Sequence, residues 1–321
     1  MVPIYISSMA PTMDEIKQYE KLFKGRKVLF IMPALSTGGA ERVMVTIIKH
    51  LNRELVSPTL MVLNQGKNVL DLEDIGCKVD VIDLKVKRAR YAPLTLISAI
   101  KKADPDTVIS TLGYLNEILS VVLPILTKKI HFIARESSVP SLRNKADSKS
   151  KLHDFIYRRF IKRFNTIVCQ STEMLEDLNG EYGIPKSQMV VIDNPLDAEY
   201  IQRKSKEECL EMNKEAHNIL AVGSLKKVKN YNLLIEEAYS STSNTKYWII
   251  GEGNERENLE KLIFEQKVGD KVVLLGHQIN PWKFMANADV FWQKSHWEGN
   301  SNAKKEWEFL KKSVTNNHLK T

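Results

Sequence analysis

Residues 27–51, KVLFIMPALSTGGAERVMVTIIKHL, place a strand, a glycine turn and a helix in immediate succession. The run 27–32 is apolar without polar alternation, which predicts a strand buried on both faces. Gly38 and Gly39 then predict a tight turn, and residues 40–51 carry apolar side chains at helical spacing. A strand followed directly by a helix predicts a parallel sheet covered by helices, as in an α/β domain.

The same succession recurs along the chain. Six further apolar runs in the first half predict strands at residues 59–63, 79–83, 107–110, 131–134, 166–169 and 190–192. After a charged stretch the pattern restarts, with strands expected at 219–222, 247–250, 272–275 and 289–292 and helices at 229–239 and 255–266. We therefore expect an α/β protein of two doubly wound, parallel-sheet, Rossmann-like domains.

The domain boundaries follow from where this pattern stops. Residues 1–26 are polar and helical in character, and we expect them to form an N-terminal extension outside the fold. The first domain covers 27–195, because Asn194-Pro195 ends regular structure. A charged linker is expected over 196–216 and the second domain over 217–321. This domain offers four strands, and no strand pattern follows Glu306, so we expect it to be incomplete, truncated at its C-terminus.

The composition points to a globular protein of a reducing compartment. Hydrophobic residues make up 43% and charged residues 27% of the chain, and no apolar run reaches the roughly eighteen residues that span a bilayer. Three cysteines, odd in number and far apart, argue against a disulfide framework or a zinc site. We therefore expect the protein in the cytoplasm.

Positive charge is concentrated in one segment. Residues 125–165 contain eleven Lys or Arg residues against three acidic ones. A helix predicted over 148–164 carries Leu152 and Phe155 in an apolar stripe beside this charge. Either the stripe faces the core and the charge is solvated, or the surface contacts anionic lipid at the inner face of the membrane. Nucleic acid is not an expected partner, because no nucleic-acid module surrounds the charge.

Several short motifs lie at strand ends, where a ligand is expected. The loop Gly38-Gly39-Ala40-Glu41-Arg42-Val43 opens a helix, so its backbone amides and the helix dipole favour an anion. It lacks the G-x-G-x-x-G spacing of a dinucleotide site. The other motifs are Asn194-Pro195-Leu196-Asp197, Gly223-Ser224-Leu225 with Lys229, Gly251-Glu252-Gly253-Asn254-Glu255-Arg256, Val272–Gly276, and Ser295–Glu298 followed eight residues later by Glu306.

In this order the motifs resemble glycosyltransferase family 4, whose members are retaining transferases of the GT-B fold. The resemblance covers roughly Lys27 to Glu306. It implies a donor that is a nucleotide-diphosphate sugar, an acceptor that is a saccharide or a lipid-linked saccharide, and no metal or other cofactor. It also implies that the acceptor belongs to the first domain and the donor to the second.

The resemblance assigns roles to individual residues. Lys229 would neutralise the leaving diphosphate, and Ser224 stands where the family has an arginine, which Lys226 or Lys227 could replace. Glu298 would lie beside the transferred sugar and Glu306 would bind the ribose. The remaining donor-binding candidates are Gly38, Gly39, Gly251 and Gly253, the last two with a structural turn as the alternative. Catalytic candidates are Glu298 and Arg135, and Asn116 and Glu117 are candidates for the acceptor side.

Two other functions stay open on the sequence. Asn300, Lys304 and Lys305 stand where the family carries apolar residues, so the chain could be a truncated, inactive or weakly binding remnant of such an enzyme. A sugar-nucleotide epimerase shares the fold. The Gly-Gly-Ala-Glu-Arg loop favours the transferases over the epimerases.

Overall fold

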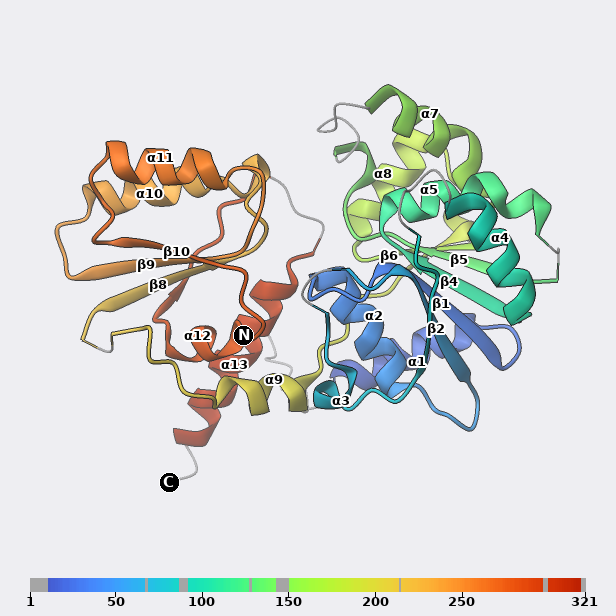
Figure 1. Ribbon diagram of the computed structural model, residues 1–321, viewed down its shortest axis with the longest axis horizontal. Coiled ribbons are helices and arrows are strands. Elements are labelled where there is room, and N and C mark those ends of the chain that lie inside the picture. Colours follow the sequence, from blue (N-terminus) through green and yellow to red (C-terminus); the bar gives the residue numbers. More distant parts are fainter. Residues whose placement is uncertain are drawn as a thin grey trace, which may run out of the picture. The chain divides into compact units, whose positions relative to one another are not determined.

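The computed structural model describes residues 11–66, 69–86, 92–126, 129–142, 150–213, 215–296 and 300–318. The chain divides into two compact units, Met1–Leu196 and Asp197–Thr321. Figure 1 colours the first from blue to yellow-green and the second from yellow to red.

The first unit is built on a seven-stranded sheet in the order β3-β2-β1-β4-β5-β6-β7. The strands are β1 Lys27–Ala34, β2 Ser57–Asn64, β3 Asp80–Asp83, β4 Thr107–Thr111, β5 His131–Arg135, β6 Thr166–Cys169 and β7 Met189–Val191. Every neighbouring pair is parallel. The chain order reverses between β1 and β4, so the carboxyl ends of these strands flank the position where doubly wound sheets bind ligands. The predicted fold class is confirmed.

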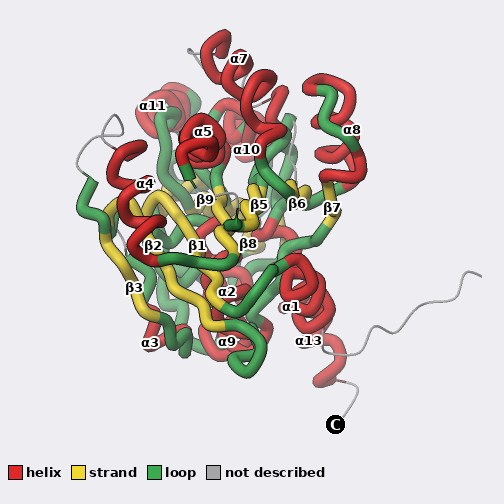
Figure 2. The backbone as a smooth tube through the Cα atoms, turned by 90° about the vertical axis from the view of Figure 1, so that its right-hand side faces the viewer, coloured by secondary structure: helices red, strands yellow, loops and turns green. Residues whose placement is uncertain are grey.

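Helices cover both faces of this sheet. They are α1 Pro11–Leu22, α2 Gly39–His50, α3 Leu72–Ile75, α4 Ala92–Ala103, α5 Gly113–Val122, α7 Ser150–Phe160 and α8 Thr172–Tyr182, with the short 3-10 segment η3 at Ile161–Arg163. Figures 1 and 2 place α4, α5, α7 and α8 over one face and α1, α2 and α3 over the other. The α5 residues Leu115 and Leu119 are fully buried against the sheet.

The N-terminal segment belongs to the fold, so the expected extension is wrong for residues 11–26. Ile16 and Tyr19 of α1 are buried, and Phe23 packs edge-on against Phe30 of β1, with ring centroids 6.0 Å apart. The Lys24 amide donates to Thr107 Oγ1 at 2.8 Å. These apolar residues recur at helical spacing among polar ones, which is the pattern of a helix that packs on a core.

The second unit contains a four-stranded parallel sheet in the order β10-β9-β8-β11. Its strands are β8 His217–Val222, β9 Thr245–Ile250, β10 Val272–Gly276 and β11 Val290–Phe291. Its helices are α9 Ala198–Ser205, α10 Tyr231–Ser240, α11 Arg256–Glu265, α12 Trp282–Asn287 and α13 Asn302–His318. Figure 1 shows α10 and α11 on one face of the sheet and α9, α12 and α13 on the other.

Part of the expected linker is therefore a helix of the second unit. The side chain of Asp197 accepts a hydrogen bond from the amide of Tyr200 and so caps α9, which packs against α12 and α13. None of the helices in the described ranges is both long and apolar enough to cross a membrane.

Candidate functional site

Two loops of the second unit are pressed together by their glycines at the carboxyl ends of β8 and β9. A Cβ atom on Gly251 would lie 1.9 Å from the carbonyl oxygen of Gly223, and one on Gly253 would lie 2.2 Å from that of Leu225. The Leu225 amide donates to the carbonyl oxygen of Glu252 at 2.9 Å. Gly251 and Gly253 thus have a packing role, because no side chain fits where the two backbones meet.

Lys229 lies over the end of β8. The 3-10 turn Lys227–Lys229 ends at Asn230, whose left-handed backbone (φ 57°) starts α10. The ammonium of Lys229 lies 3.5 Å, and the hydroxyl of Tyr231 3.0 Å, from the point that a Cβ on Gly223 would occupy. The strand order reverses between β8 and β11, so this cation stands where an open α/β sheet binds its ligand. Ser224 is exposed in the same loop.

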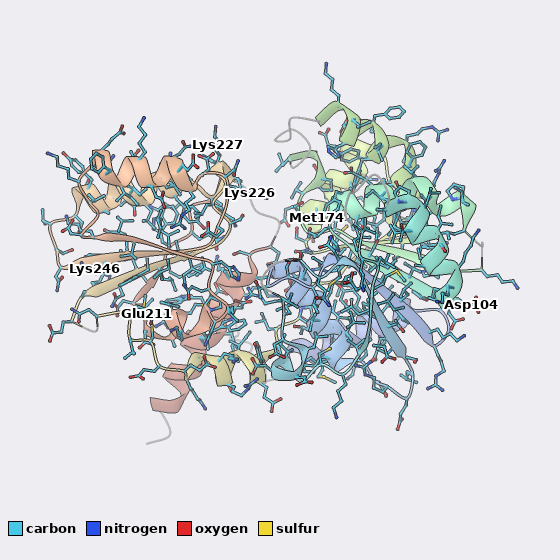
Figure 3. The ribbon with its side chains drawn as sticks, in the orientation of Figure 1. Asp104, Met174, Glu211, Lys226, Lys227 and Lys246 are labelled. Carbon is cyan, nitrogen blue, oxygen red and sulfur yellow. The ribbon has the colours of Figure 1, made fainter. Side chains whose placement is uncertain are left out.

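The neighbouring lysines lie elsewhere. Lys227 lines a cavity of about 470 Å³ together with Asn230, residues of α11 and His296. Lys226 is exposed, and Figure 3 labels both lysines on the loop that precedes α10. The expectation that Lys226 or Lys227 replaces the family's arginine gains no support from these positions. The lysine that approaches Gly223 is Lys229.

Of the two glutamates in the C-terminal motif, Glu298 and Glu306, the structure describes only the second. Glu298 lies outside the described residues. Glu306 is buried on α13, where its Oε2 accepts a hydrogen bond from Trp282 Nε1 at 2.9 Å. Lys304, two residues earlier, is exposed and Lys305 is half-buried, while Glu306 and Leu310, one turn apart, face inward.

In the first unit, Glu41 lies against the glycine turn at the carboxyl end of β1. A Cβ on Gly38 would lie 2.4 Å from Glu41 Oε2, and Ser36 Oγ donates to Oε1 at 3.2 Å. Burial raises the pKa of Glu41, and burial together with the Glu41 charge raises the pKa of Tyr114 to about 12. Sequence reasoning did not single out Glu41. Its signal was a carboxylate in the first turn of a helix that begins at a Gly-Gly loop.

Arg135 ends β5 and is fully buried. Its Nε donates to Tyr19 Oη at 3.2 Å, its Nη1 to Thr111 Oγ1 at 3.1 Å, and its Nη2 to Asn194 Oδ1. Burial raises the pKa of Tyr19, while the guanidinium opposes that rise. The guanidinium is thus bound within its own unit, and a contact between Arg135 and a sugar donor stays a prediction.

The two acceptor-side candidates are buried. Asn116 Nδ2 donates to Glu136 Oε1 at 2.7 Å, and its Oδ1 accepts from Ser110 Oγ at 2.7 Å. Glu117 Oε2 lies 2.5 Å from His153 Nδ1 and so joins α5 to α7. Both side chains hold elements of the first unit together.

These features define an α/β protein of two parallel-sheet units, the architecture of the GT-B fold. The model of Glycosyltransferase Family 4 matches residues 37–200, just over half of the chain, and that of Glycosyl transferases group 1 matches residues 202–301. The chain belongs to glycosyltransferase family 4, and it is a glycosyltransferase.

Individual relatives are distant. An N-acetylgalactosamine-N,N'-diacetylbacillosaminyl-diphospho-undecaprenol 4-alpha-N-acetylgalactosaminyltransferase of Campylobacter jejuni is 28% identical over 287 residues, which are 86% of this chain and 76% of the relative. An uncharacterized glycosyltransferase of Methanocaldococcus jannaschii is 27% identical over 88% of this chain and 66% of its own length. The crystal structure of Anabaena HepE in complex with UDP-glucose has a TM-score of 0.70 at 15% identity, covering 88% of this chain and 78% of that one, and shares the fold.

Proposed function

We propose that the protein transfers a sugar from a nucleotide-diphosphate sugar to a saccharide carried on a lipid diphosphate, with retention of configuration. The observation that carries this proposal is the Lys229 ammonium beside Gly223, at the reversal of strand order in a family 4 chain. The names of two similar proteins support the substrates. The Campylobacter relative is named for a diphospho-undecaprenol acceptor, and the HepE structure contains UDP-glucose.

Each donor-site residue has a part that suits its chemistry. Lys229 neutralises charge that develops on the leaving diphosphate, and the exposed Ser224 offers a hydroxyl beside it. Gly251 and Gly253 hold the loop that shapes the nucleotide pocket. Glu298 accepts hydrogen bonds from the transferred sugar. Glu306 accepts from the ribose through lone pairs beyond the one that Trp282 uses, since a carboxylate has about four acceptor positions.

The first unit contributes the other part of the reaction. Gly38 and Gly39 stand at the N-terminus of α2, where the helix dipole favours an anion such as a diphosphate. The acceptor belongs to this unit in the proposal. A remnant without activity is the alternative, and nucleotide binding separates the two.

Thermal unfolding with and without UDP tests the proposal. A ligand that binds only the folded state, at a concentration one hundred times its Kd, raises the free energy of unfolding by about 2.7 kcal/mol. The midpoint of thermal unfolding should therefore rise by several degrees. Tryptophan fluorescence is the suitable signal, because all five tryptophans lie in residues 197–321 and report on the second unit. An unchanged midpoint with UDP, GDP and ADP would favour the remnant.

Lipid contact is the second part of the proposal, and its basis is a surface on α7 and η3. Leu152 and Phe155, which one interpretation of the sequence turned toward the core, are 56% and 60% exposed. Phe155 packs edge-on against Phe160 at 6.3 Å, and the Arg163 guanidinium lies 4.4 Å from the Phe160 ring centre. The basic aromatic patch consists of Lys151, Leu152, Phe155, Arg159, Phe160, Lys162 and Arg163.

The charge of this surface suits an anionic bilayer. The one acidic residue of α7 and η3, Asp154, accepts a hydrogen bond from Arg158 at 2.8 Å, so its negative charge is neutralised by Arg158. The four cations of the basic aromatic patch are exposed beside the apolar side chains. Basic residues near an anionic membrane surface contribute about 1 kcal/mol each, and exposed aromatic rings add burial in the headgroup region.

Replacing Leu152 and Phe155 by alanine should lower binding to phosphatidylglycerol-containing vesicles about tenfold in a co-sedimentation assay, because about 1.4 kcal/mol or more of apolar burial is lost. The matched control is Phe264→Ala, since Phe264 is 83% exposed on α11, outside the patch. Binding that is equal for both variants, or that is unaffected by salt, would contradict the lipid contact.

A further inference from the structure

Asn194 is held by a buried network where the chain leaves the first unit. Its Oδ1 accepts a hydrogen bond from Arg135 Nη2, and its Nδ2 donates to Gln170 Oε1 at 2.9 Å. Gln170 Nε2 donates in turn to the carbonyl oxygen of Glu136 at 2.7 Å. Asn194, Arg135 and Gln170 are all at least nine-tenths buried. The oxygen and the nitrogen of the Asn194 side-chain amide are therefore both held by hydrogen bonds, which fix its orientation.

The Arg135 guanidinium joins this point to two more elements. It donates to Tyr19 Oη from α1 and to Thr111 Oγ1 from β4. A guanidinium is planar and rigid, so three acceptors around it determine its orientation. Asn194 is thus bonded directly to Arg135 at the end of β5 and to Gln170 just after β6, and through Arg135 it is linked to α1 and β4.

The chain is fixed again three residues later. Asp197 caps α9 through a hydrogen bond from the Tyr200 amide at 3.3 Å, and its carbonyl oxygen accepts from the Ile201 amide at 2.9 Å. Asn194 lies in the first compact unit and Asp197 in the second. The crossover between units therefore runs from one anchored residue to another, with Pro195 and Leu196 between them.

We propose that Arg135 is a positioning residue that acts through Asn194. By anchoring the first-unit end of the crossover, it narrows the range of orientations that the two units adopt in solution. Its consequence for turnover rests on the proposed function, because transfer needs donor and acceptor held at reacting distance. This positioning role differs from the catalytic role that the resemblance suggested for Arg135, which stays a prediction.

The range of orientations of the two units can be measured with one spin label on each unit. A wider range gives a broader distribution of distances between the labels. Labels at Leu94→Cys and Phe264→Cys suit the purpose, because these side chains are 78% and 83% exposed on α4 and α11. Cys209 is replaced by serine, while Cys77 and Cys169 are buried. Asn194→Ala and Arg135→Lys should broaden the distribution about twofold. Asn194→Asp keeps the acceptor for Arg135 and loses only the bond to Gln170, so its width should lie closer to the wild type than that of Asn194→Ala.

The matched control is Asn218→Ala in the second unit. Asn218 is also buried, accepts from Trp248 Nε1 at 2.8 Å and donates to the carbonyl oxygen of Ala216 at 3.0 Å. Its loss should lower stability and leave the width unchanged. Unchanged width in both Asn194→Ala and Arg135→Lys would overturn the inference.

Kinetics separate anchoring from donor contact. In Arg135→Lys, kcat should fall roughly tenfold while the Kd for UDP, measured by calorimetry, stays within about twofold. If Arg135→Lys instead lost much of its affinity for UDP while the distance distribution kept its width, Arg135 would contact the donor and the inference would be overturned. Absence of UDP, GDP and ADP binding in the wild type would overturn the proposed function alone, since the width measurement needs no ligand.

Discussion

Gly251→Ala is expected to destabilise the second unit by at least about 3 kcal/mol. The added Cβ would lie 1.9 Å from the carbonyl oxygen of Gly223, and the residue has φ 150°, a conformation that L side chains rarely adopt. Backbone strain costs about 1–3 kcal/mol, and displacement of the Gly223 loop adds to it. Guanidinium unfolding followed by tryptophan fluorescence measures the effect, because all five tryptophans lie in this unit.

Gly269→Ala is the matched control for this substitution. Gly269 belongs to the same unit, its φ is not positive, and the nearest atom to an added Cβ lies 3.9 Å away. Its unfolding midpoint should stay near that of the wild type or rise slightly, since alanine restricts the unfolded chain. Equal midpoints for the two variants would show that the close contact of the loops does not exist.

Lys229→Ala is expected to lower donor-dependent turnover about a hundredfold without lowering the unfolding midpoint. The substitution removes the cation that lies at the end of β8, and a lost charge-assisted interaction with a diphosphate is worth about 1.5–3 kcal/mol. Lys227→Ala is the control, because Lys227 belongs to the same 3-10 turn and lines the cavity with α11. Equal losses in both variants would point to general charge rather than to Lys229.

Strand positions could be predicted from the sequence because buried parallel strands leave a local signal. The runs at 27–32 and 166–169 each became a strand of the first sheet, since uninterrupted apolar residues pack on both faces. The run at 289–292 became only the two-residue strand β11. Asp289, just before this strand, accepts a hydrogen bond from the Asn218 amide through its side chain. Trp292, just after the strand, donates its amide to the carbonyl oxygen of Leu220.

Site residues whose roles depend on distant partners were less predictable. Arg135 contacts Tyr19 and Asn194, which are 116 and 59 residues away, so its burial has no local signal. Glu306 was expected to face a ribose, and its contact with Trp282 arises from the packing of α12 against α13. Gly251 and Gly253 lie in the loop after β9, and the backbone that each one approaches belongs to another loop, at Gly223 and Leu225, which no local pattern predicts.

The surface of α7 illustrates a different limit. Helical spacing placed Leu152 and Phe155 on one stripe, and a stripe alone does not say whether protein or lipid covers it. Their exposure in the folded chain decides against the core. What covers them is the subject of the vesicle measurement.

The most direct test of the central claim is a transfer assay on the wild-type protein. The protein is incubated with a saccharide-diphospho-undecaprenol acceptor and one nucleotide sugar at a time, including UDP-N-acetylgalactosamine and UDP-glucose. The masses of the products are then determined by mass spectrometry. The account predicts one added sugar on the acceptor for each nucleoside diphosphate released, with at least one donor. No added sugar and no released diphosphate with any donor, from protein that is folded by tryptophan fluorescence, would contradict it.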